Sequence, residues 1–150
     1  MKVFIGADHR GFHLKAEITG LLKQLKHQVV DVGSYGEEMC DYPEISYKLA
    51  REVARSKGSR GILVCMTGIG HSIAANKVRG AYAALCYTEE AAAFSRQHNN
   101  SNILVLGARF TPQDRIPGIV TTWLSSEFEG GRHLRRVKQI KEIEKKEFKA

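Results

Sequence analysis

Five short apolar runs, each separated from the next by a segment with helical features, constrain the fold of this chain more than any other feature. The runs lie at residues 3–5, 29–32, 62–64, 81–86 and 103–106. Helices are expected at residues 14–25, 45–54, from 73 onward, 89–98 and 112–124, where Pro117 kinks the last helix or delays its start. Strands that alternate with helices predict βαβ units. The sequence therefore predicts an α/β three-layer sandwich, with helices on both faces of a five-stranded parallel sheet.

Length and composition place the chain among globular proteins. Its 150 residues predict one domain, residues 1–150, and hydrophobic and charged residues make up 43% and 26% of it. The apolar runs are far shorter than the ~20 residues of a membrane helix, and the first is too short for a secretory signal, so we expect a soluble cytoplasmic protein. Cys40, Cys65 and Cys86 are widely spaced and form no CxxC pair, which favours neither a disulfide framework nor a zinc site.

The formal net charge of +7 belongs mainly to the carboxyl-terminal tail. Residues 132–150 contain eight Lys/Arg and three Asp/Glu, a net of +5, and the remaining residues contribute +2. We expect a helix at 131–150 whose apolar residues recur every third position, at Leu134, Val137, Ile140 and Ile143. This stripe is too narrow for a core element, so we expect it to pack on a second subunit. A basic helix of this kind is more typical of a solvated surface or a small-anion site than of a nucleic-acid binder.

Residues 60–77 combine a strand end, a thiol and a glycine-rich turn. The apolar run ends at Cys65, the turn covers residues 67–72, and helical sequence begins at Ile73. Such a turn leaves backbone N–H groups free to bind an anion, or an oxyanion that forms during a reaction. A free cysteine is commonly a small buried core residue, whereas a thiolate beside a helix start is reactive. Both interpretations of Cys65 stay open at this point.

Other reactive side chains are expected near Cys65, because ligands of a parallel sheet bind beyond the carboxyl ends of its strands. We place two residues there from the end of the first strand, Asp8 and His9, and two from the third strand, Cys65 and Thr67. The helix before the fifth strand adds His98 and Asn99, and the end of the fifth strand adds Arg109. Asp8 and His9 are equally suited to cap the first helix, and His98 to act as a cation at a helix end. The first strand is followed by GADHRG rather than GxGxxG, and the turn at 68–72 lacks a P-loop lysine. These differences exclude an ordinary dinucleotide site and a P-loop nucleotidase.

Five motifs occur in an order and at intervals typical of one enzyme family. They are Gly6-Ala7-Asp8-His9-Arg10-Gly11-Phe12, Asp41-Tyr42-Pro43, Thr67-Gly68-Ile69-Gly70 with Ser72-Ile73-Ala74-Ala75-Asn76-Lys77, Arg96-Gln97-His98-Asn99 and Glu129-Gly130-Gly131-Arg132-His133. Over nearly its whole length the chain resembles the type B ribose-5-phosphate isomerases, whose family includes the galactose-6-phosphate isomerase subunits. The resemblance implies a Rossmann-like homodimer or dimer of dimers with active sites shared between subunits. It also implies interconversion of ribose 5-phosphate and ribulose 5-phosphate through a cis-enediolate, without a metal or an organic cofactor.

The same resemblance implies a role for each site residue. Cys65 is the base that moves a proton between C2 and C1 of the open-chain sugar, and Thr67 assists proton movement among the sugar hydroxyls. His98, with Asp8 nearby, opens the furanose ring. The enediolate oxygen is held by the backbone amides of Gly68, Ile69, Gly70, His71 and Ser72. The phosphate is bound by His9, Arg132 and Arg136, joined by Arg109, and the sugar is lined by Tyr42 and Asn99.

Two residues depart from the family pattern. Met66 stands where glycine usually follows the cysteine. It is strained if this position needs a positive φ; if the position needs only room, its side chain either points away from the pocket or trims it. His71 replaces a nonpolar residue, and it either adds a proton donor or faces solvent; we expect it to face solvent. The departures leave a hexose 6-phosphate, such as allose or galactose 6-phosphate, open as the substrate. Two alternatives are not isomerases. The first is a sugar-phosphate-binding protein without catalytic activity, and the second, which we favour least, is a nucleic-acid-binding protein that uses the basic tail.

Overall fold

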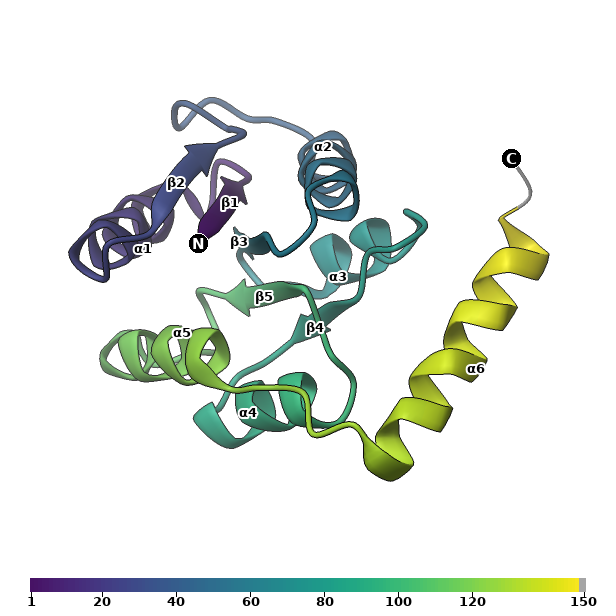
Figure 1. Ribbon diagram of the computed structural model, residues 1–150. Helices are drawn as coiled ribbons and strands as arrows, with labels where there is room; N and C mark the ends of the chain where they lie inside the picture. The colour runs from purple at the N-terminus through teal and green to yellow at the C-terminus, as the bar shows by residue number, and fades with distance from the viewer. Residues whose placement is uncertain (149–150) are drawn as a thin grey trace.

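The computed structural model describes residues 1–148, in which five parallel strands form one sheet (Figure 1). The strands are β1 (Lys2–Ala7), β2 (Gln28–Asp31), β3 (Arg60–Cys65), β4 (Ala83–Leu85) and β5 (Ile103–Gly107). Their order is β2-β1-β3-β5-β4, so β3 lies at the centre. The register aligns Ala7 with Val64 and Cys65 with Gly107, so the carboxyl ends of β1, β3 and β5 meet at one edge. The predicted five-stranded parallel sheet is confirmed.

Helices cover both faces of the sheet and complete the predicted three layers. One face carries α1 (Phe12–Gln24), α4 (Glu89–Gln97) and α5 (Ile116–Ser125), and the other carries α2 (Tyr42–Arg55) and α3 (Ile69–Ala75) (Figure 1). A 3-10 turn at Gln113–Arg115 precedes α5, and Pro117 lies in the first turn of α5. The helix thus starts late, because proline is tolerated in a first turn and not in a helix interior. No helix within residues 1–148 has the length and apolar character needed to span a membrane.

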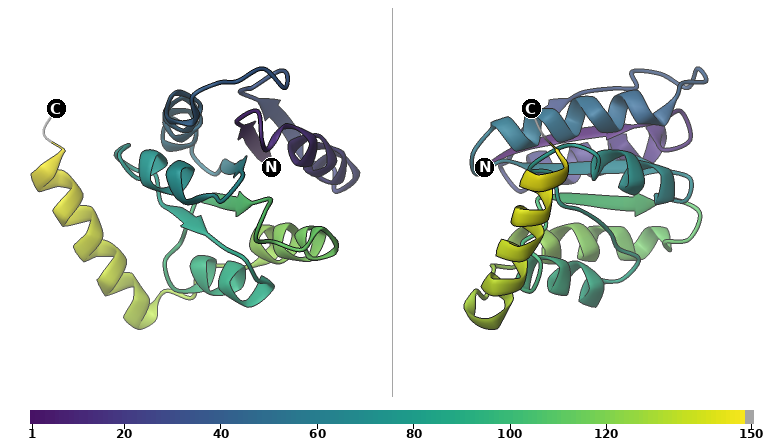
Figure 2. Two further views of the ribbon diagram at one scale, coloured as in Figure 1. Left: turned by 180° about the vertical axis from the view of Figure 1, so that it is seen from behind. Right: turned by 90° about the vertical axis from the view of Figure 1, so that its right-hand side faces the viewer.

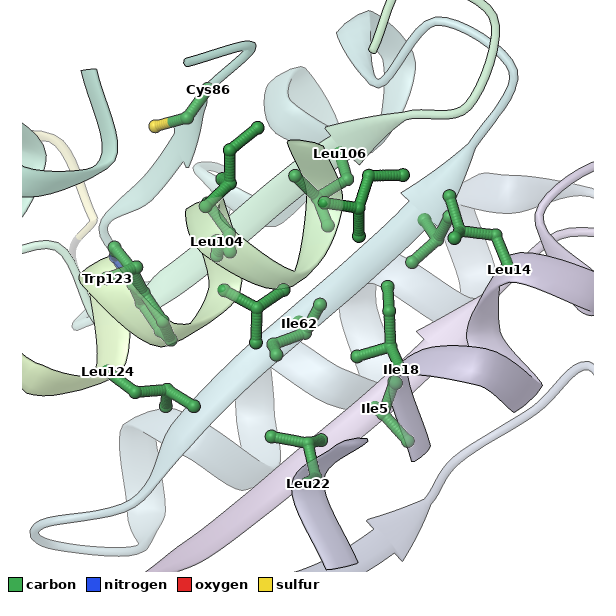
Figure 3. Close-up of a cluster of buried hydrophobic side chains, with 14 of the residues drawn as sticks. Ile5, Leu14, Ile18, Leu22, Ile62, Cys86, Leu104, Leu106, Trp123 and Leu124 are labelled. Atoms are coloured by element: carbon green, nitrogen blue, oxygen red, sulfur yellow. The ribbon is translucent and has the colours of Figure 1, made fainter. Parts of the chain in front are cut away.

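The larger hydrophobic cluster lies between the sheet and the helices α1 and α5 (Figure 3). Ile5 and Ile62 point into it from the strands, Ile18 enters from the predicted apolar face of α1, and Trp123 enters from α5. All four are at most 1% exposed, and burial of one such side chain stabilises the fold by about 1.5–3 kcal/mol. The Trp123 indole N–H donates to Ser101 Oγ at 2.9 Å, so its polar group is also satisfied. This packing holds the strands, and hence their carboxyl ends, in place.

The last helix, α6 (Gly131–Glu147), extends away from the three layers (Figure 2). Its first turns are anchored by His133 and Val137, which are buried. Its last turn is anchored by Glu144, which accepts hydrogen bonds from the Gly80 N–H at 2.6 Å and the Tyr82 hydroxyl at 3.1 Å. The rest of the expected apolar stripe is exposed, at Leu134, Ile140 and Ile143. The helix expected at 131–150 is therefore observed to Glu147, and residues 149–150 lie outside the described part of the chain.

An ion pair with a buried lysine and an exposed aspartate joins α1 to the end of β2. The Lys15 side chain is 3% exposed, and its ammonium bonds both Asp31 carboxylate oxygens, at 2.8 and 2.7 Å. Asp31→Asn removes one charge at nearly constant size and leaves the ammonium without its counter-ion. Because the Asp31 side chain is 39% exposed, we expect the free energy of unfolding, measured by urea denaturation, to fall by about 1–2 kcal/mol. Lys23→Gln on the exposed side of α1 is the control, with an expected change below about 0.5 kcal/mol; equal losses in both variants would contradict the ion-pair argument.

Candidate active site

Cys65 ends the central strand and is 6% exposed. The Gly68 N–H donates to its Sγ atom at 3.0 Å, so the chain folds back over the thiol directly after the strand. Burial raises the pKa of the Cys65 thiol and outweighs the opposing effect of the Gly68, Thr67 and His71 amides. The helix start therefore does not bring the pKa of the free thiol below its ordinary value. Cys65 is protonated near neutral pH and needs a further group to act as a base.

The turn after Cys65 depends on Gly68. Its φ of +84° is a left-handed conformation that favours glycine, and a Cβ atom there would lie 2.4 Å from Leu85 Cδ1. α3 begins immediately afterwards, at Ile69, which is four residues before the start expected at residue 73. The amides of residues 68–72 therefore belong to the first turn of this short helix, close to the end of β3. The Ile69 N–H is already bonded to Thr67 Oγ1, at 3.3 Å.

Met66 fits without backbone strain. Within residues 1–148, Lys26 and Asn100 are the only non-glycine residues with a positive φ, so this position does not require glycine. The Met66 side chain is partly exposed, and its Sδ atom accepts a hydrogen bond from Arg10 Nη1 at 3.1 Å. It lines an open groove beside the turn. Of the expected consequences, the structure thus agrees with the trimmed pocket.

The groove has a volume of about 650 Å³, and its lining includes His9, Arg10, Met66 and Arg109. Backbone hydrogen bonds tie it to the thiol, because the Ala108 N–H donates to the Cys65 carbonyl and the Arg109 N–H to the Met66 carbonyl, each at 2.9 Å. The structure therefore brings His9 and Arg109 to the same edge of the sheet as Cys65. Positively charged side chains at this edge are suited to an anionic ligand.

Asp8 follows β1 and is buried. Its Oδ1 atom accepts hydrogen bonds from the Arg10 and Gly11 N–H groups, each at 3.0 Å, so Asp8 closes the turn that leads into α1. A carboxylate oxygen of Asp8 also lies within 4.8 Å of Cys65 Sγ and of a His71 ring nitrogen. The N-cap of α1 is Gly11, and no side chain caps it, so the expectation that Asp8 caps the first helix is wrong: Asp8 closes the turn before the helix, and the same side chain lies close to the thiol.

His71 is fully buried, so the prediction that it faces solvent is wrong. Its Nδ1 atom lies 2.5 Å from Ser46 Oγ on α2, and its ring meets the edge of Tyr42 with 5.7 Å between centroids. Tyr42 can approach because a Cβ on Gly70 would lie only 2.6 Å from its ring. The physical reason for the error is the early start of α3, which turns residue 71 toward α2. Ser46 carried no signal in the sequence, because its role depends on the packing of α2 against α3.

His98 belongs to a second cluster, near the start of α6. Its ring stacks on Phe94 and on His133, with centroid separations of 4.7 and 4.2 Å and interplanar angles of 13° and 10°. Glu129 Oε2 lies 4.0 Å from His98 Nε2 and 3.7 Å from His133 Nε2. Arg132 Nε lies 3.4 Å from His133 Nε2. Desolvation, together with the neighbouring His98 and Arg132, lowers the pKa of His133.

This second cluster and Cys65 lie at opposite edges of the sheet in one chain. Asn99 and His98 precede β5, whose first residue pairs with Gly61 near the start of β3, whereas Cys65 pairs with the last residue of β5. β3 alone spans about 16 Å at a rise of ~3.3 Å per residue. The prediction that His98 and Asn99 join the carboxyl ends of the strands is therefore wrong. In a βαβ unit, the helix before a strand ends at that strand's amino end, and this rule was the available signal.

Three neighbours of His98 carried no functional expectation from the sequence alone. They are Phe94, Glu129 and His133. Phe94 lies four residues before His98 on one helix, a spacing that predicts contact, and Glu129 and His133 are also four residues apart. Spacing therefore indicates each pair. The convergence of the two pairs depends on the approach of α6 to α4, which spacing does not encode.

Both clusters combine residue types that bind metal ions. In the sets Asp8/Cys65/His71 and His98/Glu129/His133, the ligand atoms lie within 4.8 Å of one another. The same atoms can serve as proton donors and acceptors without an ion. The expectation of a site without metal or organic cofactor stays a prediction.

The parallel α/β fold, the thiol at the central strand end and the histidine–arginine cluster on the last helix define a sugar-phosphate isomerase class. Residues 3–140 match the family described as Ribose/Galactose Isomerase, and the chain belongs to this family. The resemblance predicted from the five motifs is confirmed.

Individual relatives match over nearly their full length. Ribose-5-phosphate isomerase B of Escherichia coli (strain K12) is 42% identical over 145 residues, 97% of this chain and 97% of that protein. The structure of Clostridium thermocellum ribose-5-phosphate isomerase B is similar with a TM-score of 0.95 at 50% identity, and covers 97% of this chain and 99% of its own. The Mycoplasma genitalium enzyme, crystallised with bound ribulose-5-phosphate, has a TM-score of 0.92 at 43% identity, with 96% of both chains covered.

Proposed function

We propose that this protein interconverts ribose 5-phosphate and ribulose 5-phosphate through a cis-enediolate, with Cys65 as the base and without a cofactor. One observation carries the proposal: in a chain of the ribose/galactose isomerase family, Cys65 ends the central strand beneath a turn of backbone amides. The relative from Mycoplasma genitalium binds ribulose-5-phosphate, and two further relatives are named ribose-5-phosphate isomerase B.

The proposed reaction moves one proton along the open-chain sugar. Cys65 takes the proton from C2, the C1–C2 double bond forms, and O1 becomes an oxyanion. Within the turn at residues 68–72, the N–H groups of Gly68, Ile69 and Ser72 are bonded to Cys65 Sγ, Thr67 Oγ1 and the Gly68 carbonyl, so the amides of Gly70 and His71 would hold this oxyanion. Thr67 passes the hydroxyl proton from O2 to O1. Cys65 then returns its proton to C1. The product is an isomer of the substrate, so no redox cofactor is required.

We further propose a homodimer, or a dimer of dimers, in which the His98 cluster of one subunit faces Cys65 of its partner. Because the two clusters lie at opposite edges of one chain, a second chain has to supply the ring-opening histidine. Apolar side chains suited to such an interface are exposed near both clusters, at 50% for Ile69, 60% for Ile73 and 42% for Leu134. Their burial would contribute about 25 cal/mol per Å² to association. A two-fold contact of this kind produces two equivalent sites.

In this dimer the substrate is bound from both subunits. His9 and Arg109 line the groove beside Cys65 and would hold the phosphate from one side. Arg132 and Arg136 lie one turn apart on exposed positions of α6 and would hold it from the other. Tyr42, which packs over Gly70, and Asn99, which follows His98, would contact the sugar from the two sides, respectively.

Arg136→Gln tests the phosphate site. The guanidinium neutralises the phosphate in the ground state and in the transition state alike, so its loss should raise KM for ribose 5-phosphate about tenfold or more and change kcat less. Steady-state kinetics in a coupled assay measure both constants. Arg135→Gln is the matched control, because Arg135 lines another face of α6 with Leu134 and Lys138. Equal KM values for the two variants would contradict the assignment of Arg136.

A coupled isomerase assay over pentose 5-phosphates and hexose 6-phosphates tests the activity itself. We expect the highest kcat/KM on ribose 5-phosphate, because Met66, in place of glycine, occupies part of the lining of this groove and leaves less room for a longer sugar phosphate. A higher value on allose or galactose 6-phosphate would overturn the pentose assignment and keep the reaction type. Binding of these sugar phosphates without turnover would favour the sugar-phosphate-binding protein instead.

We expect the protein to act in the cytoplasm. Cys40, Cys65 and Cys86 are all free. A reducing compartment keeps such thiols unpaired, and the proposed base acts only in its reduced form.

A further inference from the structure

His71 has one ring nitrogen without a geometrically formed hydrogen bond, although the Val64 backbone carbonyl lies close enough to the ring to raise its pKa. Its Nε2 atom is buried and, among residues 1–148, has no hydrogen-bond partner. An unpaired polar atom in a protein interior costs about 1–3 kcal/mol, so it calls for a functional explanation. A ring nitrogen of His71 lies within 4.8 Å of Cys65 Sγ and of an Asp8 oxygen, and Nδ1 is the nitrogen that contacts Ser46.

We infer that Nε2 of His71 accepts the thiol proton of Cys65, so that a thiol–imidazole pair is the base. This inference rests on the proposed isomerase function and adds to it the group that Cys65 needs in order to lose its proton. The separation is longer than a hydrogen bond. In free enzymes such contacts are often long, and they shorten when the substrate binds.

The hydrogen bonds of Ser46 determine which ring nitrogen carries the proton. The Ser46 hydroxyl donates its single proton to the Tyr42 carbonyl, at 2.9 Å, one helical turn earlier. With the hydroxyl proton on the Tyr42 side, His71 Nδ1, at 2.5 Å from the same oxygen, is the donor in the second bond, and this tautomer is part of the inference. A neutral imidazole that is protonated at Nδ1 has a lone pair on Nε2. Nε2 is thus a proton acceptor.

The electrostatics of the buried site keep the thiol and the imidazole neutral in the free protein, so the proposed transfer takes place only together with removal of the C2 proton. Burial lowers the pKa of His71 to about 4, although Asp8 opposes the shift, so the lone pair is available throughout the neutral range. Burial also raises the pKa of Cys65, and both shifts disfavour an isolated buried charge. Proton transfer between the two creates an adjacent ion pair without net charge. The other titratable groups that face this pair are Asp8, next to β1, and Tyr42, on α2.

The proposed transfer is balanced over one turnover. The S–H bond of Cys65 breaks as the N–H bond forms at His71 Nε2, which leaves an imidazolium. In the same step the sulfur takes the C2 proton, and the imidazolium positive charge offsets the negative charge of the enediolate. The S–H proton then passes to C1, and the imidazolium returns its proton to Sγ. No oxidant, reductant or further reactant takes part.

His71→Asn separates this role from a structural one, because the asparagine amide keeps a donor near Nδ1 and lacks Nε2. We expect kcat to fall by about 10²-fold with KM changed by less than about threefold. In the wild type, log kcat should be flat between pH 6 and 8. In the variant only preformed thiolate acts, so log kcat should rise by about one per pH unit. A variant with wild-type kcat and a flat profile would overturn the inference.

Alkylation of Cys65 by iodoacetamide, followed by peptide mass spectrometry, tests the pair without the isomerase reaction. At neutral pH the rate should be about tenfold higher in the wild type than in His71→Asn, because only the wild type can pass the thiol proton to a neighbouring acceptor as the sulfur is alkylated. His27→Asn, at the opposite edge of the sheet, is the matched control and should follow the wild type. If the protein isomerises no sugar phosphate, the proposed function fails, and the alkylation rates still support or overturn the pair.

A measurement on the unmodified chain covers the case in which His71→Asn does not fold. Nitrogen-15 NMR of the histidine rings distinguishes a protonated from an unprotonated nitrogen. We expect His71 to be protonated at Nδ1 only at neutral pH. A proton on Nε2 would make this atom a donor and would overturn the inference.

Discussion

Cys65→Ser is expected to lower kcat for ribose 5-phosphate isomerisation by about 10³-fold or more while the fold stays intact. The serine hydroxyl is close in size to the thiol, so the end of β3 and the following turn keep their packing. A hydroxyl holds its proton far more strongly than a thiol, so it cannot remove the C2 proton. The coupled assay measures the loss, and circular dichroism with thermal unfolding verifies the fold.

Cys86→Ser is the matched control, because Cys86 is also buried, at 2% exposed, and lies outside the proposed site. We expect this variant to keep its activity and to lose some stability, since a hydroxyl is placed in an apolar cluster. If Cys65→Ser kept full activity, or if both variants lost it equally, the assignment of Cys65 as base would be refuted.

Mixing two inactive variants is expected to restore activity if the site is shared between subunits. Cys65→Ser removes the base from one edge of the sheet, and His98→Asn removes the ring-opening histidine from the other. A mixed dimer contains one site with both changes and one site with neither. Random exchange makes half of the dimers mixed, so the mixture should reach about a quarter of the wild-type activity.

The mixture is prepared by joint refolding, and native mass spectrometry confirms that mixed dimers have formed. Cys65→Ser mixed with Cys65→Ala is the control, because no combination of these subunits contains an intact site. Recovery in the test mixture alone supports the shared site. If mixed dimers form without recovery, Cys65 and His98 do not act across the interface.

Periodicity was sufficient to predict most of the framework. The apolar face of α1 and the strand-length runs were read correctly, because side chains in regular elements repeat over a few residues. The late start of α5 followed from Pro117 alone. The start of α3 was expected at Ile73, where the apolar residues begin, but the left-handed Gly68 ends the turn and the helix starts four residues earlier than expected, at Ile69.

Some positions of the proposed site residues follow from the local sequence, and others depend on how distant parts of the chain pack together. Local pattern alone places Cys65 at a strand end, Asp8 in the turn that follows β1 and glycines in the turn after Cys65, because each of these depends on bonds within a few residues. Only the packed chain decides which edge of the sheet His98 reaches and which helix His71 meets. The first depends on the direction of β5, and the second on a contact between α2 and α3 across 25 positions of sequence. Because His71 lies beside Cys65 in the folded chain, the thiol becomes a candidate base with a nearby proton acceptor. Because His98 lies at the opposite edge of the sheet, each chain holds only half of the proposed site, and a second subunit would complete it.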